Sequence, residues 1–361
     1  MSPGAFALLA ALASGASLNG SGHAARHGLT RAAVWKQVQS LRRAGVVIRA
    51  RPGVGYQLDR PIGLLDRDAI EREIDRTMGR DAPDPKIAPA GKNIRKSAET
   101  SAPVDATGTP TVEVHAVTES TNLWLGKHFR PRHAVLAEFQ SGGRGRRGRQ
   151  WVSPPAAGIC LSFGYEFQCG LPRLGPLSLV AGIAVAETVA AQGVEVGLKW
   201  PNDLQVGGRK LGGLLVEIRG PSDGPCQVVI GVGLNVDLAD REAVVSESDS
   251  EAESLYRPPD QPWTDLVRAG LEDPDRNRLA GQLIAALDRA CREIEVLGFE
   301  PFAARWSGFD LLANRDVRAI DGSGGTFTGR ALGVTGQGGL RVSTDQGIVE
   351  LAAAEVSIRV F

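Results

Sequence analysis

A run of glycine and arginine between residues 142 and 151 most constrains the fold of this chain. It spells Gly-Gly-Arg-Gly-Arg-Arg-Gly-Arg-Gln-Trp, a composition that ordinary folded surface does not require. Glycine tolerates left-handed backbone angles and lets the chain come close to a ligand. Arginine supplies a permanent charge and forked donors that suit phosphate or carboxylate. The run therefore predicts an anion-binding loop, and its flanks decide which fold can carry it.

The spacing of Gly143, Gly145 and Gly148 also fits the dinucleotide-binding fingerprint, which needs a strand before it and a helix opening from it. A short strand is expected upstream, at 134 to 137. Downstream, Trp151-Val152-Ser153-Pro154-Pro155 cannot open a helix, and a strand-like stretch follows at 158 to 163. This context disfavours a Rossmann site. A disordered basic patch is the alternative for an isolated run of this kind.

The composition is that of an ordinary globular protein. With 361 residues, 42% of them hydrophobic, the chain is expected to form two or three domains with a substantial core. The four cysteines stand far apart without C-x-x-C pairing, so we expect free thiols in a reducing cytoplasm rather than disulfides or a zinc site. They are Cys160, Cys169, Cys226 and Cys291.

The apolar start at residues 6 to 13 is interpreted as a buried first helix rather than a signal peptide, because no basic residue precedes it. No other segment looks long and apolar enough to span a bilayer. The sequence therefore predicts a soluble, cytoplasmic protein with no membrane partner.

The net charge of zero conceals an asymmetry. Residues 1 to 60 hold eight Lys or Arg and one acidic residue, so the rest of the chain carries a compensating acidic excess. A positive field confined to one end favours a polyanionic partner for that end.

This basic segment has the layout of a winged helix-turn-helix, with helices expected at 5 to 14, near 21 to 27, and from Thr30 onward. Gly20 and Gly22 make the middle element the weakest of the three. A hairpin wing is expected from strands at 46 to 48 and 51 to 58. The helix that begins at Thr30 would bury Val34, Val38 and Leu41 and leave a polar face for a DNA groove: Arg31, Trp35, Gln39 and Arg42. The alternative is a basic module that merely docks on the rest of the protein.

The rest of the chain alternates strands and helices. Low hydrophobicity predicts a flexible linker at 79 to 110, after a helix at 64 to 78, and a solvated acidic insertion at 242 to 262. Between them we expect strands near 112 to 116, 134 to 138, 159 to 166, 196 to 199, 211 to 218 and 227 to 236, with helices at 120 to 128 and 176 to 191. After a helix at 277 to 296, a glycine-punctuated tail from 311 to 361 suits a small β-barrel.

Four further segments have compositions that packing alone does not require. Glu119-Ser120-Thr121-Asn122 places hydroxyl and amide groups at a helix start, where they would cap the helix or bind a polar ring. Lys199-Trp200-Pro201-Asn202-Asp203 ends a strand in a proline turn. Arg209-Lys210-Leu211-Gly212-Gly213 follows an expected hairpin turn at Gly207-Gly208. Gly231-Val232-Gly233-Leu234-Asn235-Val236 is a strand that carries glycines and one amide.

Together these segments resemble the biotin-protein ligases, and the winged helix in front is similar to the bifunctional biotin ligase and biotin operon repressor. The resemblance runs from about residue 5 to the end, without the linker and the acidic insertion. Five motifs stand in family order: Ser-Thr-Asn at 120 to 122, Gln140, Gly-Arg-Gly-Arg-Arg-Gly at 143 to 148, Lys-Trp-Pro-Asn-Asp at 199 to 203, and Arg-Lys-Leu-x-Gly at 209 to 213.

The resemblance implies an α+β protein with three domains and one linker segment. Residues 1–62 would form the winged helix-turn-helix, 63–110 a helix and linker, 111–310 a catalytic domain with a mixed sheet like that of class II synthetases, and 311–361 an SH3-like β-barrel. The implied reaction joins biotin and ATP to give biotinyl-5′-AMP and pyrophosphate, then passes the biotinyl group to one lysine of a carrier domain such as that of acetyl-CoA carboxylase. Repression of biotin-synthesis genes by an adenylate-bound homodimer on a DNA operator is the second implied function.

The resemblance also assigns roles to residues. Lys210 and Arg146 would be catalytic, since cations lower the repulsion between a carboxylate and a phosphate and stabilise charge on the phosphoryl oxygens. The implied biotin contacts are Ser120, Thr121, Asn122, Gln140, Arg144, Gly145, Arg146 and Lys210. The implied ATP or adenylate contacts are Gly143, Arg147, Gly148, Arg149, Trp151, Asn202 and Asp203, with Trp151 against the adenine. Mg²⁺ would come with ATP rather than bind a protein cluster, and Asp203 is its candidate protein ligand.

Three alternatives stay open at this point. The protein could be a ligase with a vestigial N-terminal domain, or a non-enzymic regulator whose pocket senses biotin, although sensing has less need of the Arg146 and Lys210 pair. A lipoate or related acyl ligase is disfavoured, because the Gly-Arg loop has the biotin-ligase form. The glycines of the loop predict disorder without ligand and closure with it.

Overall fold

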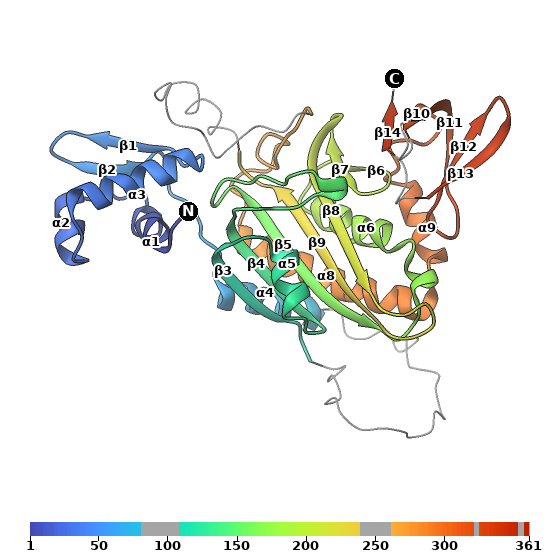
Figure 1. Ribbon diagram of the computed structural model, residues 1–361, viewed down its shortest axis with the longest axis horizontal. Helices are drawn as coiled ribbons and strands as arrows, with labels where there is room; N and C mark the ends of the chain where they lie inside the picture. The colour runs from blue at the N-terminus through green and yellow to red at the C-terminus, as the bar shows by residue number, and fades with distance from the viewer. Residues whose placement is uncertain (81–107, 239–260, 321–324, 353–356, 361) are drawn as a thin grey trace.

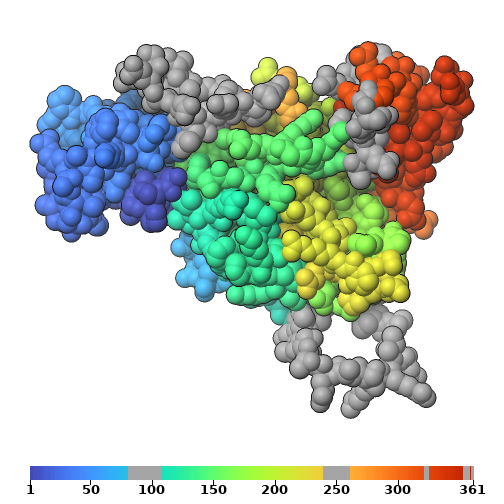
Figure 2. All heavy atoms as spheres, in the orientation of Figure 1, coloured from blue at the N-terminus to red at the C-terminus, as the bar shows by residue number. Residues whose placement is uncertain are grey.

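The computed structural model describes residues 1–80, 108–238, 261–320, 325–352 and 357–360. Its N-terminal part contains α1 (Pro3–Leu12), α2 (Gly20–Arg26) and α3 (Arg31–Arg43), followed by the antiparallel pair β1 (Ile48–Arg51) and β2 (Gly55–Leu58). The expected three helices and hairpin wing are therefore present. Figure 2 shows this part as a lobe at one end of the molecule.

The short helix α2 forms despite its two glycines. Asn19 caps it by accepting a hydrogen bond from the Gly22 amide at 2.9 Å, and His23 and Ala24 are buried. A Cβ at Gly20 would lie 3.1 Å from the Tyr56 ring of the wing, so a larger side chain would crowd this contact. Capping and burial here outweigh the poor helix propensity of glycine.

Helix α3 buries the face that its periodicity predicts. Thr30 Oγ1 accepts from the Ala33 amide at 3.1 Å, and Val34, Val38 and Leu41 are buried. On the opposite face Trp35 is 54% exposed. Arg42 was expected on this polar face, but its side chain contacts the wing. Its Nε and Nη2 both donate to the Ile48 carbonyl, at 3.2 and 2.8 Å, and link the helix to the wing.

A seven-stranded mixed sheet forms the centre of the molecule (Figure 1). Its strand order is β3-β4-β5-β9-β8-β7-β6; β3 and β4 are parallel and the other neighbours are antiparallel. The strands are β3 (Thr111–Thr118), β4 (His133–Gln140), β5 (Gly158–Phe167), β6 (Gly197–Lys199), β7 (Asp203–Val206), β8 (Arg209–Arg219) and β9 (Cys226–Asn235). Strand β7 was not predicted, but the turn at Gly207-Gly208 that joins it to β8 was, and both glycines have positive φ.

The two faces of this sheet differ because side chains alternate along each strand. One face carries large apolar residues that pack under α4 (Arg67–Arg80), α6 (Leu177–Ala190) and α8 (Arg276–Leu297). On the other face, Val135 and Val229 of the sheet form a small apolar cluster with Leu125 of α5 (Thr121–Lys127). Figure 1 shows α5 alone in front of the sheet and α6 and α8 behind it. The sheet face beside α5 is thus free to carry small and polar residues.

The chain ends in a second sheet, drawn in red in Figure 1, which follows the unpredicted helix α9 (Glu300–Ser307). It is antiparallel with order β13-β12-β11-β10-β14. The strands are β10 (Asp316–Ile320), β11 (Thr326–Val334), β12 (Leu340–Thr344), β13 (Gly347–Leu351) and β14 (Ser357–Val360). The described pairings give an open five-stranded sheet, and its closure into a barrel stays a prediction.

Most of the predicted linker at 79 to 110 and of the acidic insertion at 242 to 262 lies outside the described residues. Within the described residues, the helical segment Leu171–Ala190 is long and apolar enough to cross a membrane, contrary to the sequence expectation. Most of it is buried inside the fold, as in a core helix. All four cysteines are free.

A buried ion pair ties the start of α8 to the central sheet. Arg276 Nη2 lies 2.8 Å from Glu138 Oε2, and the side chains are 6% and 1% exposed. Arg276 also donates to the carbonyls of Gly158 and Gly63, at 3.0 and 2.9 Å, while Glu138 accepts from the Leu65 amide. These bonds hold the segment between the N-terminal lobe and α4 against the sheet.

Candidate functional site

The floor of the candidate site is the face of the sheet beside α5. On β9, a Cβ at Gly231 would collide with Asn122 Oδ1, and one at Gly233 would collide with the Trp151 ring. The two glycines are therefore required for close approach, and they let the start of α5 and the Trp151 indole lie directly on the sheet. The contact of Trp151 with the floor does not test whether it lies against adenine, which stays a prediction.

Polar side chains at the start of α5 form a buried hydrogen-bonded cluster. Gln140 Oε1 accepts from the Thr121 amide at 2.8 Å and lies 3.2 Å from Thr121 Oγ1. Ser162 Oγ lies 2.8 Å from Thr121 Oγ1 and 2.6 Å from Asn122 Oδ1. Ser120 is buried at the N-cap, but its side chain makes no capping hydrogen bond, so Gln140 takes the role expected of the helix's own residues.

Two members of this cluster, Ser162 and Glu217, were missed from the sequence. Asn122 Nδ2 donates to Glu217 Oε2 at 2.9 Å and to the Leu215 carbonyl at 3.2 Å. Glu217 Oε1 also lies 3.6 Å from Arg144 Nη1 of the glycine-arginine loop. A signal was present, because each residue is polar and follows the alternation of its strand onto the face opposite the core. The family motifs alone do not show this two-residue alternation.

The glycine-arginine loop folds back on itself beside this cluster. The Gly145 amide donates to the Arg149 carbonyl at 2.7 Å, and the Trp151 amide donates to the Gly143 carbonyl at 2.9 Å. Only part of the expected glycine geometry is present: Gly148 has φ +72°, whereas Gly145 is extended. Gly143 is needed for a different reason, since a Cβ there would collide with the Trp151 carbonyl.

The tip of the loop is exposed, and one of its arginines also has a left-handed backbone. Arg147 takes φ +56° although it is not a glycine, and it is exposed together with Gly148 and Arg149. The other expected loop contact, Arg144, lies 48% exposed beside Glu217. Exposed arginines therefore lie on both arms of the folded loop as well as at its tip.

A cationic end of the site forms where the loop meets the β7–β8 hairpin. Arg146 Nη1 donates to Asn202 Oδ1 at 3.0 Å, and Asn202 Nδ2 donates to the Leu214 carbonyl at 2.8 Å. Lys210 Nζ lies 2.6 Å from Asp203 Oδ1, with both side chains less than a fifth exposed. The structure thus brings together four residues that the sequence assigned from three separate motifs.

Burial changes the pKa of a cation at this end of the site. It lowers the pKa of the Arg146 guanidinium, Asp203 raises that pKa, and Arg147 and Arg149 lower it again. Partly dehydrated cations attract an anion more strongly than cations in bulk water do. This end of the site is therefore suited to phosphate or carboxylate.

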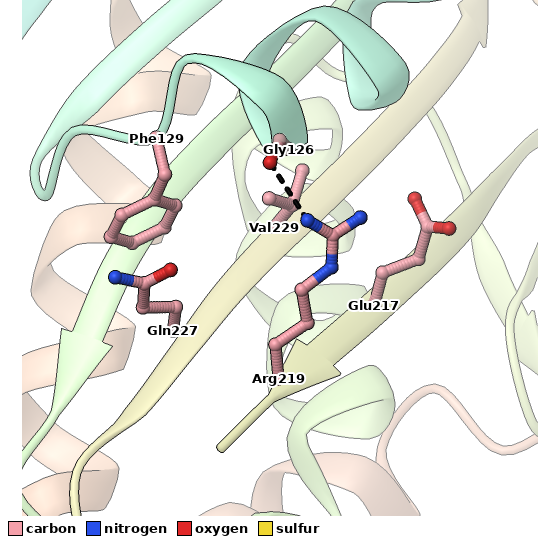
Figure 3. A pocket seen from close by; sticks show the side chains of 6 residues that line it. All are labelled: Gly126, Phe129, Glu217, Arg219, Gln227 and Val229. Atoms are coloured by element: carbon pink, nitrogen blue, oxygen red, sulfur yellow. Dashed lines mark hydrogen bonds between the residues drawn. The ribbon is translucent and has the colours of Figure 1, made fainter.

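A shallow hollow lies beside Glu217, between α5 and strands β8 and β9 (Figure 3). In this hollow Arg219 Nη1 donates to the Gly126 carbonyl at 2.8 Å, near the end of α5. A cation here satisfies a carbonyl that has no partner within the helix and interacts favourably with the helix dipole. The far end of α5 is thereby fixed on the same strand that carries Glu217.

No group of three or more His, Cys, Asp or Glu side chains among the described residues could hold a metal ion. Asp203 offers one carboxylate at the cationic end, and Lys210 contacts one of its oxygens. Mg²⁺ in nucleotide sites is commonly held by one or two carboxylates together with phosphate oxygens. Asp203 therefore fits a metal that arrives with a nucleotide, and it does not form a protein-only site.

The chain is similar to known proteins along nearly its whole length. The bifunctional ligase/repressor BirA of Salmonella typhimurium is 34% identical over 98% of this chain and 96% of its own length, and BirA of Escherichia coli matches equally well. The chain belongs to the biotin protein ligase family. It has the domain content of the bifunctional members, with a helix-turn-helix domain in front of the ligase domain, as the sequence predicted.

Further matches cover the separate parts of this biotin protein ligase. The Biotin/lipoate A/B protein ligase family matches residues 114–235, the Biotin protein ligase C terminal domain matches 313–359, and an HTH domain matches 7–57. A solved structure of biotin protein ligase from Aquifex aeolicus, in complex with biotin and ATP, superposes with a TM-score of 0.55 at 24% identity. It covers 69% of this chain and 99% of that chain, which shows a shared fold.

Proposed function

We propose that this ligase activates biotin with ATP to biotinyl-5′-AMP and pyrophosphate, then transfers the biotinyl group to one lysine of a biotin carrier domain. The single observation that carries the proposal is that a neutral polar cluster and a pair of cations lie in one site. The Thr121, Asn122, Gln140 and Ser162 cluster offers paired donors and acceptors on the glycine floor, and Arg146 and Lys210 lie at the other end of the same face.

In this proposal the polar cluster binds the ureido ring of biotin and the glycine-arginine loop closes over its carboxylate. Ser120, Thr121, Asn122 and Gln140 then bind the ring, while Arg144, Gly145 and Arg146 cover the carboxylate. Gly143, Arg147, Gly148, Arg149, Trp151 and Asn202 contact the nucleotide. Lys210 and Arg146 neutralise the two anions that react, since preorganised cations stabilise charge that develops on phosphoryl oxygens.

Mg²⁺ would supply charge neutralisation on the triphosphate, with Asp203 as the protein group that reaches it. The domain boundaries that we propose are those expected from the sequence: 1–62, 63–110, 111–310 and 311–361. The bound biotin and ATP of the Aquifex aeolicus ligase support biotin and ATP as the substrates.

The proposal is tested with biotin, MgATP and a biotin carrier domain that another ligase is known to modify. We expect the carrier to gain the mass of one biotinyl group, and a carrier whose acceptor lysine is replaced by arginine to gain none. Omission of Mg²⁺ in the presence of a chelator should abolish the reaction. An unmodified carrier in the complete mixture would remove the proposed activity.

We also propose that the N-terminal domain binds an operator, with Arg31, Trp35 and Gln39 on the exposed face of α3. Residues 1 to 60 carry the basic excess of the chain, and Trp35 is exposed on this face. The bifunctional relatives are ligase/repressors, which supports operator binding. In this proposal the operator is palindromic and a homodimer binds it, as helix-turn-helix proteins commonly do. Arg42 is assigned to the fold of this domain, because it holds the wing strand.

Replacing Arg31 with alanine is expected to weaken operator binding about tenfold, because a guanidinium at the start of a recognition helix contacts base edges or phosphate. A gel shift on the promoter region of the organism's biotin-synthesis genes, with biotin and ATP present, measures the change. The matched control is R173A, an exposed arginine of the ligase domain. No shift by the unaltered protein at low salt, with or without biotin and ATP, would leave a ligase with a vestigial N-terminal domain.

A further inference from the structure

The turn of the wing carries an unpaired cation and an exposed apolar side chain. Two other arginines of this region are held within the fold: Arg42 donates to the backbone of β1, and Arg49 Nε lies 2.5 Å from Asp59 Oδ1. Arg51, at the end of β1, is exposed, and its side chain has no hydrogen-bond or ion-pair partner among the described residues. In the same turn Val54 is 47% exposed.

The wing is held both at its tip and at its base. Leu18, which precedes α2, pairs with Tyr56 through two backbone hydrogen bonds of 2.7 and 2.9 Å. Gly55 has φ +120°, and a Cβ there would collide with the Leu18 carbonyl, so the tip lies against the start of α2. Arg42 links the base to α3, and Figure 1 shows the turn at the end of the lobe farthest from the ligase domain. Because the turn is already ordered, little conformational entropy is lost when it binds a partner.

A cation beside an apolar side chain suits the minor groove of DNA. A phosphate contact would use Arg51 alone and would leave Val54 in water. Proteins that bind the minor groove combine the two groups, because arginine is attracted to the negative potential of a narrow A·T-rich groove and apolar side chains pack against the base steps inside it. The proposed operator complex places α3 in a major groove, and the next groove along the duplex is a minor groove. The wing lies beside α3, so we assign its tip to that groove.

We infer that Arg51 enters the minor groove at the flank of each half-site and gives the operator a preference for A·T pairs there, with Val54 packed inside the groove. The inference rests on the proposed operator binding, and it adds specificity at base pairs that α3 does not contact. The minor-groove edge separates A·T from G·C through the amino group of guanine, but it does not separate A·T from T·A. The expected preference is therefore for base composition and not for base order.

Three duplexes that differ only at the flanks test the inference. Footprinting of the unaltered protein on the promoter fragment first locates the half-sites and their flanks. The flanks are then made A·T, G·C or I·C, since inosine lacks the amino group of guanine and gives I·C the minor-groove edge of A·T with the major-groove edge of G·C. We expect the A·T and I·C duplexes to bind about tenfold more tightly than the G·C duplex, which is within the range that base-pair changes in a site produce.

Replacing Arg51 with alanine should remove this preference. We expect R51A to bind all three duplexes with an affinity within about twofold of that of the unaltered protein for the G·C duplex, because no guanidinium then enters the groove. The thermal unfolding midpoint should not change, since the Arg51 side chain contacts no partner in the described fold. The matched control is R49A on the same strand, whose arginine is paired with Asp59. It should keep the preference for A·T and I·C, even where the loss of positive charge lowers its affinity for all three duplexes.

Three results would overturn the inference while leaving operator binding intact. The first is an R51A protein that still prefers the A·T and I·C duplexes. The second is an R51A protein whose affinity falls by the same factor for all three duplexes, which is the result of a phosphate contact. The third is an I·C duplex that binds as weakly as G·C, which would place the discrimination in the major groove. If the unaltered protein binds none of the duplexes at low salt, with biotin and ATP present, the operator proposal fails and the inference fails with it.

Discussion

Replacing Lys210 with methionine is expected to slow biotinyl-adenylate formation by about a hundredfold to a thousandfold, the range found when one preorganised donor to developing charge is removed. Lys210 Nζ lies 2.6 Å from Asp203 and 17% of its side chain is exposed. Its loss removes a cation where two anions react and leaves the Asp203 carboxylate to repel the nucleotide. Biotin-dependent exchange of pyrophosphate into ATP measures this step directly.

Two further variants serve as comparisons for K210M. Lys127→Met removes an exposed lysine at the end of α5 and should leave the exchange rate unchanged. Asp203→Asn retains the charge of Lys210 but removes the carboxylate proposed to reach Mg²⁺, so raised Mg²⁺ should restore part of its activity and should not restore that of K210M. A K210M rate within tenfold of the unaltered protein would contradict the assigned role.

The second large effect concerns stability. Replacing Arg276 with methionine should lower the free energy of unfolding of the ligase domain by about 3–5 kcal/mol, because Glu138 would become a buried charge without its partner. Glu138 is 1% exposed, and Arg276 also satisfies the carbonyls of Gly63 and Gly158. Denaturant titration followed by tryptophan fluorescence measures the change.

The control for this prediction lies two residues further along α8. Arg278 has a side chain that is 58% exposed, so R278M should change stability by no more than about 0.5 kcal/mol. Adding Glu138→Gln to R276M should recover part of the loss, since the uncompensated charge is then absent. Equal midpoints for R276M and R278M would show that the buried pair contributes no stability.

The sequence was most informative where a local rule determines the structure. Apolar periodicity predicted the buried face of α3, and the glycine pair at 207 and 208 predicted the β7–β8 turn. The segment after the loop indicated that no helix could open there, and β5 follows it. Each of these rules depends on neighbours in the chain, which a single sequence displays in full.

Local propensity was less informative where a contact outside the element decides the outcome. The Thr121 amide is capped by Gln140 rather than by a side chain of α5, and Arg42 is held by the wing carbonyl of Ile48. Helix α2 forms because Asn19 and the neighbouring wing compensate for its glycines. None of these outcomes follows from propensity, since each is decided by a specific contact made after the elements have packed.

The sequence by itself determined the family and predicted which cationic residues serve the site, because the glycine-arginine loop and the other motifs express both in residue types and spacing. Only the tertiary structure decided how these residues act together. Asn122 and Glu217 are 95 residues apart in the chain, as Glu138 and Arg276 are 138 apart. Strand alternation gives the face on which a side chain lies, but sheet order and register decide which side chain it meets there.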